Sequence, residues 1–129
     1  MAAPPQPRGH GAIGQATVEA ALVLPFVFLL LLAVVQVGLL VRAQVLVTHA
    51  AREAARAAAV DSDGDAATRA AHEATTLDPD RMTVTVEGRD GRGSRVTVHV
   101  RYHAATDVPL VGALLGDVDL DGEATMRVE

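Results

Sequence analysis

An uncharged stretch of 22 residues, from Ala20 to Val41, constrains this chain more than any other feature. As a helix it would be about 33 Å long, close to the roughly 30 Å of a bilayer's hydrocarbon core. Gln36 is its only strongly polar side chain, whereas a helix of this length in a soluble protein normally carries a polar face. We therefore predict a single transmembrane helix, with membrane lipid as its surroundings.

Two other interpretations of this stretch fit less well. A secretory signal peptide has an apolar region of about 7–15 residues, followed by a cleavage site of small residues. The stretch here is longer, and residues 42–60 continue a helical pattern instead. A buried core helix would need more apolar chain to cover it than the rest of the sequence supplies. Membrane insertion is the better prediction.

The remainder of the chain is acidic and poor in large apolar side chains. From Arg42 onward there are 15 acids and ten arginines, a net charge of −5. This balance argues against nucleic acid as a partner, because phosphate contacts need a basic surface. Two Phe, one Tyr and no Trp leave a core of Val, Leu and Ala. The absence of cysteine excludes disulfides, thiolate catalysis and thiolate metal sites.

Residues 42–60 contain neither Pro nor Gly and are rich in Ala, the best helix former, so the membrane helix is expected to continue to about Val60. Small residues at helical spacing, among them Ala50 and Ala54, would form a stripe that another helix could approach closely, and Gly38 would allow the same within the membrane. The high helix propensity of Ala explains the stripe equally well.

Residues 61–129 predict a small α+β domain outside the membrane. Its expected elements are a turn at 61–65, a short helix at 66–76, a hairpin of strands 82–87 and 96–103 around a Gly-rich turn, an apolar loop or short helix at 110–115 that covers the sheet, and a third strand at 124–129. The predicted fold class is α+β, with a disordered leader at 1–14, a helix at 15–60 and a three-stranded antiparallel sheet.

No catalytic or metal-binding pattern emerges from the acidic and histidine residues. Asp117, Asp119 and Asp121 resemble the start of a calcium loop, but its twelfth position is Val128 and not Glu, so a solvated turn is the better interpretation. His99 and His103 would lie about 13 Å apart along a strand, which suits surface residues. We expect no enzyme activity, no cofactor and no metal.

The residues before the apolar stretch have a distinctive arrangement. A Pro- and Gly-rich segment with one Arg precedes Gly14, and Glu19 follows five positions later. A charge at the mouth of a membrane helix is uncommon and needs a reason. This arrangement resembles type IV-like prepilins of bacteria. The string Gly-Gln-Ala-Thr-Val-Glu-Ala-Ala-Leu-Val-Leu-Pro at 14–25 resembles TadE-like pseudopilins in particular, and Ala-Ala-Arg-Glu-Ala-Ala-Arg at 50–56 resembles their second signature.

The resemblance implies processing and assembly. A membrane prepilin peptidase would cut between Gly14 and Gln15, and the new amine would pair with Glu19 of an adjacent subunit, in a helix that carries Pro25. Implied partners are other pilin-like subunits, an ATPase and a platform membrane protein of a tight-adherence pilus or related secretion system. Two departures are Ala20, where the family often has an aromatic residue, and Gln36, where it often has an acid. Alternatively, Glu19 only complements the helix macrodipole.

The orientation in the cell membrane follows from the resemblance, which implies a cytoplasmic N-terminus and an extracytoplasmic C-terminus. A count of Arg residues near the two membrane boundaries slightly favours the opposite orientation, and we overrule it because the margin is small. The alternative function is a single-pass anchored binding module unrelated to pilus assembly, which would have no need of Gly14. An anchored enzyme would need a catalytic constellation, and none is visible in the sequence.

Overall fold

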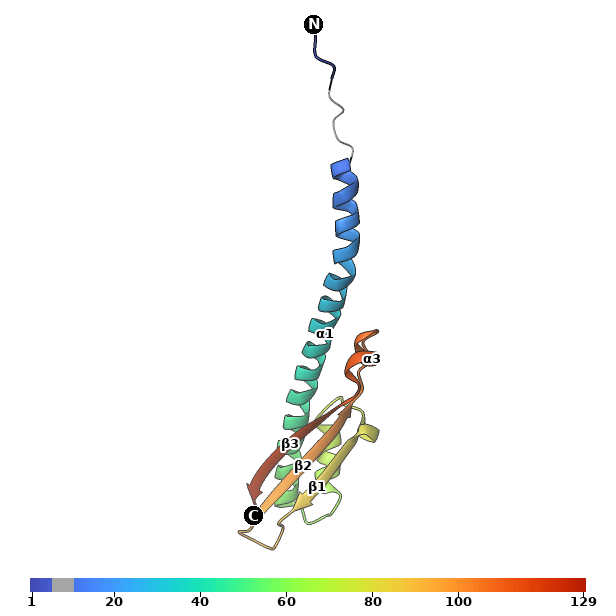
Figure 1. The fold of residues 1–129 in the computed structure, drawn as a ribbon. Coiled ribbons are helices and arrows are strands. Elements are labelled where there is room, and N and C mark those ends of the chain that lie inside the picture. The colour runs from blue at the N-terminus through green and yellow to red at the C-terminus, as the bar shows by residue number, and fades with distance from the viewer. Residues whose placement is uncertain (6–10) are drawn as a thin grey trace.

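A computed structural model describes residues 1–5 and 11–129 of the chain, and its main element is one 50-residue helix, α1, at Gly11–Val60. Figure 1 shows α1 projecting far beyond a small head that gathers around its C-terminal part. The helix passes through Pro25 without interruption. It begins earlier than the predicted boundary, so residues 11–14 are helical, while the leader residues 6–10 lie outside the described part of the chain.

The head contains two further helices, a 3-10 turn and three strands. In chain order these are α2 at Ala66–Glu73, η1 at Pro79–Arg81, β1 at Met82–Glu87, β2 at Arg95–Ala104, α3 at Val111–Leu115 and β3 at Val118–Arg127. The strands form one antiparallel sheet in the order β1-β2-β3. The predicted α+β class with a three-stranded sheet is thus confirmed, and β3 is longer at its start than predicted.

The core lies between the sheet and the C-terminal half of α1. Alternation along β2 turns Val96, Val98 and Val100 to one face, where they are buried together with Val47 of α1. Helix α2 packs against α1 and β1, so both helices lie over the same face of the sheet (Figure 1). The predicted helix at 15–60 and domain at 61–129 therefore share one hydrophobic core.

Small residues set the close distance between α1 and the sheet. At Gly122 of β3, an added Cβ would lie 2.9 Å from the carbonyl oxygen of Val47 and 3.1 Å from its Cγ1. Ala50 and Ala54 are fully buried within this core. The helix that approaches this predicted stripe belongs to the chain itself, because α2 and the sheet occupy that face. Gly38, in contrast, has nothing within 4 Å of its ideal Cβ position.

Two further expectations about the head are wrong. Asp119 and Asp121 lie on β3 and not in a solvated turn, because pairing with β2 extends the strand back to Val118. Helix α3 does not cover the sheet. It lies beyond the end of β2 and contacts α1, leaving Leu114 exposed (Figure 1).

Candidate functional site

The N-terminal half of α1 is a bare apolar surface. Every described side chain from Gly14 to Leu31 is exposed, including Leu22, Phe26 and Phe28. By length and composition, α1 is the one helix in the described chain that suits a membrane span, and none of its most apolar window is buried. Water disfavours this much apolar area at about 25 cal/mol per Å², so lipid or other apolar helices must cover it.

Glycine at position 14 is not required by the fold. Gly14 lies within α1, and an ideal Cβ there would meet nothing within 4 Å. A glycine inside a helix costs roughly 0.5–1 kcal/mol relative to alanine. The chain's own packing therefore gives no reason for a glycine at this position.

Glu19 stands on the exposed surface of α1, slightly more than one turn beyond Gly14. Gln15 and Glu19 are four residues apart and therefore lie on the same face of the helix. The structure thus brings these two predicted site residues together, whereas Pro25 and Gly38 lie further along α1. A neighbouring helix that contacts this face would meet residues 15 and 19 at once.

The outer face of the sheet carries a row of cross-strand polar pairs, which we call the charge ladder. Three basic residues of β2 stand opposite acids of β3: His99 opposite Glu123, Arg101 opposite Asp121 and His103 opposite Asp119. The closest atoms of these pairs are 3.6, 2.9 and 2.7 Å apart, respectively. Exposed pairs of this kind are individually worth about 0–1 kcal/mol, so the ladder sets the register of β3 more than its stability.

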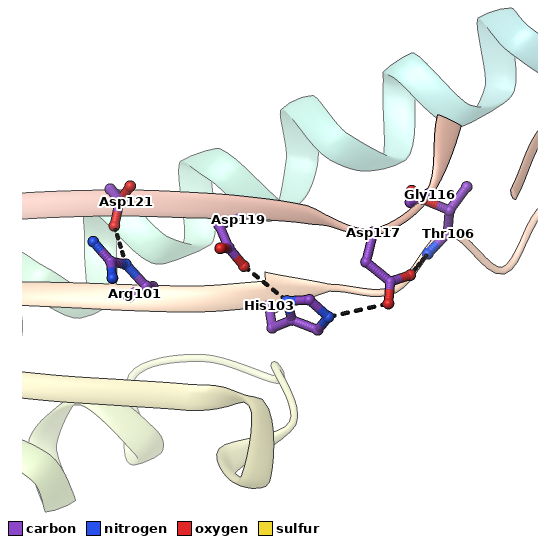
Figure 2. Close-up of polar contacts among 7 residues, drawn as sticks. All are labelled: Arg101, His103, Thr106, Gly116, Asp117, Asp119 and Asp121. Atoms are coloured by element: carbon purple, nitrogen blue, oxygen red, sulfur yellow. Dashed lines mark hydrogen bonds and ion pairs between the residues drawn. The ribbon is translucent and has the colours of Figure 1, made fainter. Parts of the chain in front are cut away.

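His103 ends the charge ladder and holds two carboxylates (Figure 2). Its Nδ1 lies 2.7 Å from Asp119 and its Nε2 lies 3.0 Å from Asp117. Carboxylates only accept hydrogen bonds, so this arrangement favours the doubly protonated ring. The hydrogen bond to Asp119, and then the one to Asp117, raise the pKa of His103. The bond to His103, followed by that from the Thr106 amide, lowers the pKa of the Asp117 carboxyl.

The same cluster closes the loop that carries α3. The Thr106 amide donates to Asp117 at 3.4 Å, and the Thr106 hydroxyl donates to the carbonyl oxygen of Gly116 at 2.5 Å (Figure 2). These contacts join the chain where it leaves β2 to the chain where it enters β3. We call His103, Thr106, Asp117 and Asp119 the loop clasp. Its hydrogen bonds tie the two ends of this loop together.

The sequence predicts His99 and His103 as surface residues but does not reveal the charge ladder. The pairing depends on which strands are neighbours and in what register, which no spacing within the sequence reveals. One signal was present. A period of two relates the basic residues at 99, 101 and 103, and the same period relates the acids at 119, 121 and 123. When two strands with this pattern pair antiparallel, each basic side chain can stand opposite an acid.

A long uncovered apolar helix joined to a small α+β head defines the class of a single-pass membrane-anchored protein. A sequence model of the family described as TadE-like protein matches residues 14–56. This match confirms the resemblance over that part of α1. The sheet lies outside the matched residues. No curated protein and no solved structure matches the chain.

Proposed function

We propose that the chain is a pseudopilin-like subunit that is cleaved between Gly14 and Gln15 and assembles with other pilin-like subunits through α1. The observation that carries this proposal is the bare N-terminal half of α1, whose TadE-like match begins at Gly14, a glycine that the fold does not need. Its role is mechanical and includes no catalytic step of its own. A prepilin peptidase would supply the cleavage, and an ATPase and a platform membrane protein would drive assembly.

Glu19 gives the assembly its axial register. Cleavage creates an amine on Gln15, on the same helical face as the Glu19 carboxylate. An unpaired carboxylate in lipid costs several kcal/mol, so a neighbouring subunit that supplies an amine lowers the free energy in only one axial position. In this proposal the N-terminus faces the cytoplasm, where the peptidase acts, and the head lies outside.

The direct test is the N-terminus of the mature protein in cells that contain the pilus machinery. We expect intact-mass measurement or N-terminal sequencing to give Gln15 as the first residue. Gly14→Leu should leave the chain uncleaved. Gly38→Leu is the matched control, because Gly38 lies in the same helix with equally empty surroundings, and it should be cleaved normally. Cleavage of Gly14→Leu, or a mature protein that retains Met1, would contradict the proposal.

The anchored binding module predicts a different result in the same experiment. Such a protein acts from the membrane without processing, so Gly14→Leu would leave its activity unchanged. The outer sheet face does contain a shallow hollow, lined in part by Thr83, Thr85, His99 and Arg101, that a soluble ligand could contact. Because this hollow is open and has polar residues in its lining, an anchored binding module is the second candidate function.

A further inference from the structure

The loop between β2 and β3 displays an apolar surface on an otherwise polar head. Residues 108–116, which we call the apolar tip, contain no charge and lie between Asp107 and Asp117. Leu110, Leu114 and Leu115 are 60%, 80% and 59% exposed. Within residues 61–129, the other exposed large apolar side chain is Val86, at 37%. Leucines this exposed and this close together mark a contact surface.

Contacts at its base give the apolar tip a defined conformation. Val108 and Val111 are buried and anchor its inner side. Gly112 lies so close to the carbonyl of Thr106 that an added Cβ would overlap it. Leu110 has a φ of 66°, in the left-handed region that a residue with a Cβ rarely adopts. Together with the loop clasp, these contacts hold the leucines outward on a fixed base.

The apolar tip is placed beside the apolar half of α1. Strand β2 ends close to Gln36 and Leu40, which line a small pocket together with Ala105 and Asp107. Helix α3 contacts α1 and points along it towards its N-terminal half (Figure 1). From Leu32 onward α1 is covered on one side only: Gln36 is 2% exposed, whereas Val34 and Val37 stay exposed. The apolar tip therefore lies beside a helix whose other apolar side chains are open to the surroundings.

We propose that the apolar tip inserts into the boundary of the lipid bilayer next to α1 and forms a second membrane contact of the head. Lipid is the occupant that the placement favours, because the tip extends the surface of α1 that is itself apolar on all sides. Its nine residues carry no charge to be desolvated, and the flanking Asp117 is held in the loop clasp by His103. This inference rests on membrane insertion of α1, but not on cleavage or pilus assembly.

The test measures lipid contact at single labelled sites of the full chain. Because the protein has no cysteine, Leu114→Cys gives one attachment point for an environment-sensitive fluorophore. The labelled chain is reconstituted in phosphatidylcholine–phosphatidylglycerol vesicles with or without nitroxide-labelled lipid. Leu30→Cys in α1 is the positive control. Asp90→Cys, in the turn at the opposite end of β2, is the negative control, about 30 Å away along the strand.

We expect the label at position 114 to shift its emission to shorter wavelength and to lose most of its intensity with nitroxide lipid, as at position 30, with no change at position 90. Quenching at 30 without quenching at 114 would overturn the inference while leaving membrane anchoring intact. A blue shift at 114 without quenching would also overturn it, since a neighbouring protein would then cover the tip. Absence of quenching at both 30 and 114 would overturn the inference together with the anchor on which it rests.

Discussion

Individual side chains in this protein carry two separate tasks, one in the membrane helix and one at the end of the sheet. Glu19 stands exposed on α1, on the same face as the amine that cleavage would create. His103 lies on the head, between Asp117 and Asp119, where it holds the loop that leads to α3. The role proposed for Glu19 needs a second subunit, whereas the contacts of His103 are complete within the chain.

Replacing Glu19 is predicted to separate assembly from processing. Glu19→Gln removes the negative charge and keeps the shape of the side chain, so the chain should be cleaved and inserted but should fail to co-assemble. Site-specific cross-linking between α1 helices in intact membranes measures this. Glu73→Gln, an exposed acid on α2, is the control and should assemble normally. Normal cross-linking of Glu19→Gln would show that Glu19 only complements the helix dipole.

The loop clasp is predicted to weaken as pH rises. The folded-state pKa of His103 is raised, so its contribution to stability is fully present below the ordinary histidine value of about 6.5 and is lost as pH rises through the folded-state pKa. The pKa of Asp117 is lowered, so its contribution is present above the ordinary aspartate value and is lost as pH falls through the folded-state pKa.

Thermal unfolding of the chain in detergent, followed by circular dichroism, checks this pH dependence. The difference in Tm between the wild type and His103→Gln should be present at about pH 5.5 and should shrink at about pH 9. His49→Gln, an exposed histidine on α1, is the control and should show no such pH-dependent difference. A difference for His103→Gln that stays constant across this range would contradict the proposed pairing.

At the scale of elements, the contact between α1 and β3 decides how the head is packed. Gly122 lies against the backbone of Val47. The short side chains of Ala50 and Ala54 allow the rest of the head to pack close to the same helix. Larger residues at any of these positions would push the sheet away from the helix. The Ala-rich composition of residues 42–60 is thus a requirement of the head's own core.

Gly122→Ala is predicted to destabilise the head by about 1–3 kcal/mol, because the added methyl group would overlap the Val47 carbonyl and force a backbone shift. Chemical unfolding of the head, monitored by circular dichroism, gives the free energy of unfolding. Gly64→Ala is the matched control, since its Cβ position is empty, and it should change the stability far less. Equal effects of the two substitutions would argue against the close approach of β3 to α1.

At the scale of the whole molecule, α1 is at once a membrane helix and the central helix of the head. Its bare N-terminal half has no contact with the sheet, and its C-terminal half contributes Val47 and a series of alanines to the core. Any tilt of α1 in the membrane is therefore transmitted to the head as one body, and the apolar tip would give that body a second point of contact with lipid.

Because α1 contributes to the core of the head, only fragments that include its C-terminal half are predicted to fold. A fragment of residues 61–129 should be unfolded in water, because it lacks the helix that covers the sheet. A fragment of residues 40–129 keeps Val47, Ala50 and Ala54 and should fold. Dispersion of amide signals in NMR spectra distinguishes the two. A folded 61–129 fragment would show that the sheet and α2 suffice as a core.

The sequence by itself determined the elements that depend on neighbouring residues. The length of the apolar stretch predicts α1, alternation predicts the β1–β2 hairpin, and the strings around Gly14 and Ala50 indicate the TadE-like family. These features can be predicted because helix and strand periodicity and short sequence strings are local properties of the chain.

Only the tertiary structure decided what these elements face. The alanine stripe, predicted to admit another helix, packs against the chain's own α2 and sheet, and the acids at 117–121 belong to a strand and the loop clasp instead of a turn. The apolar segment at 110–115 lies beside α1 instead of over the sheet. Each outcome depends on contacts between residues far apart in the sequence, and the register that creates those contacts exists only after the chain has folded.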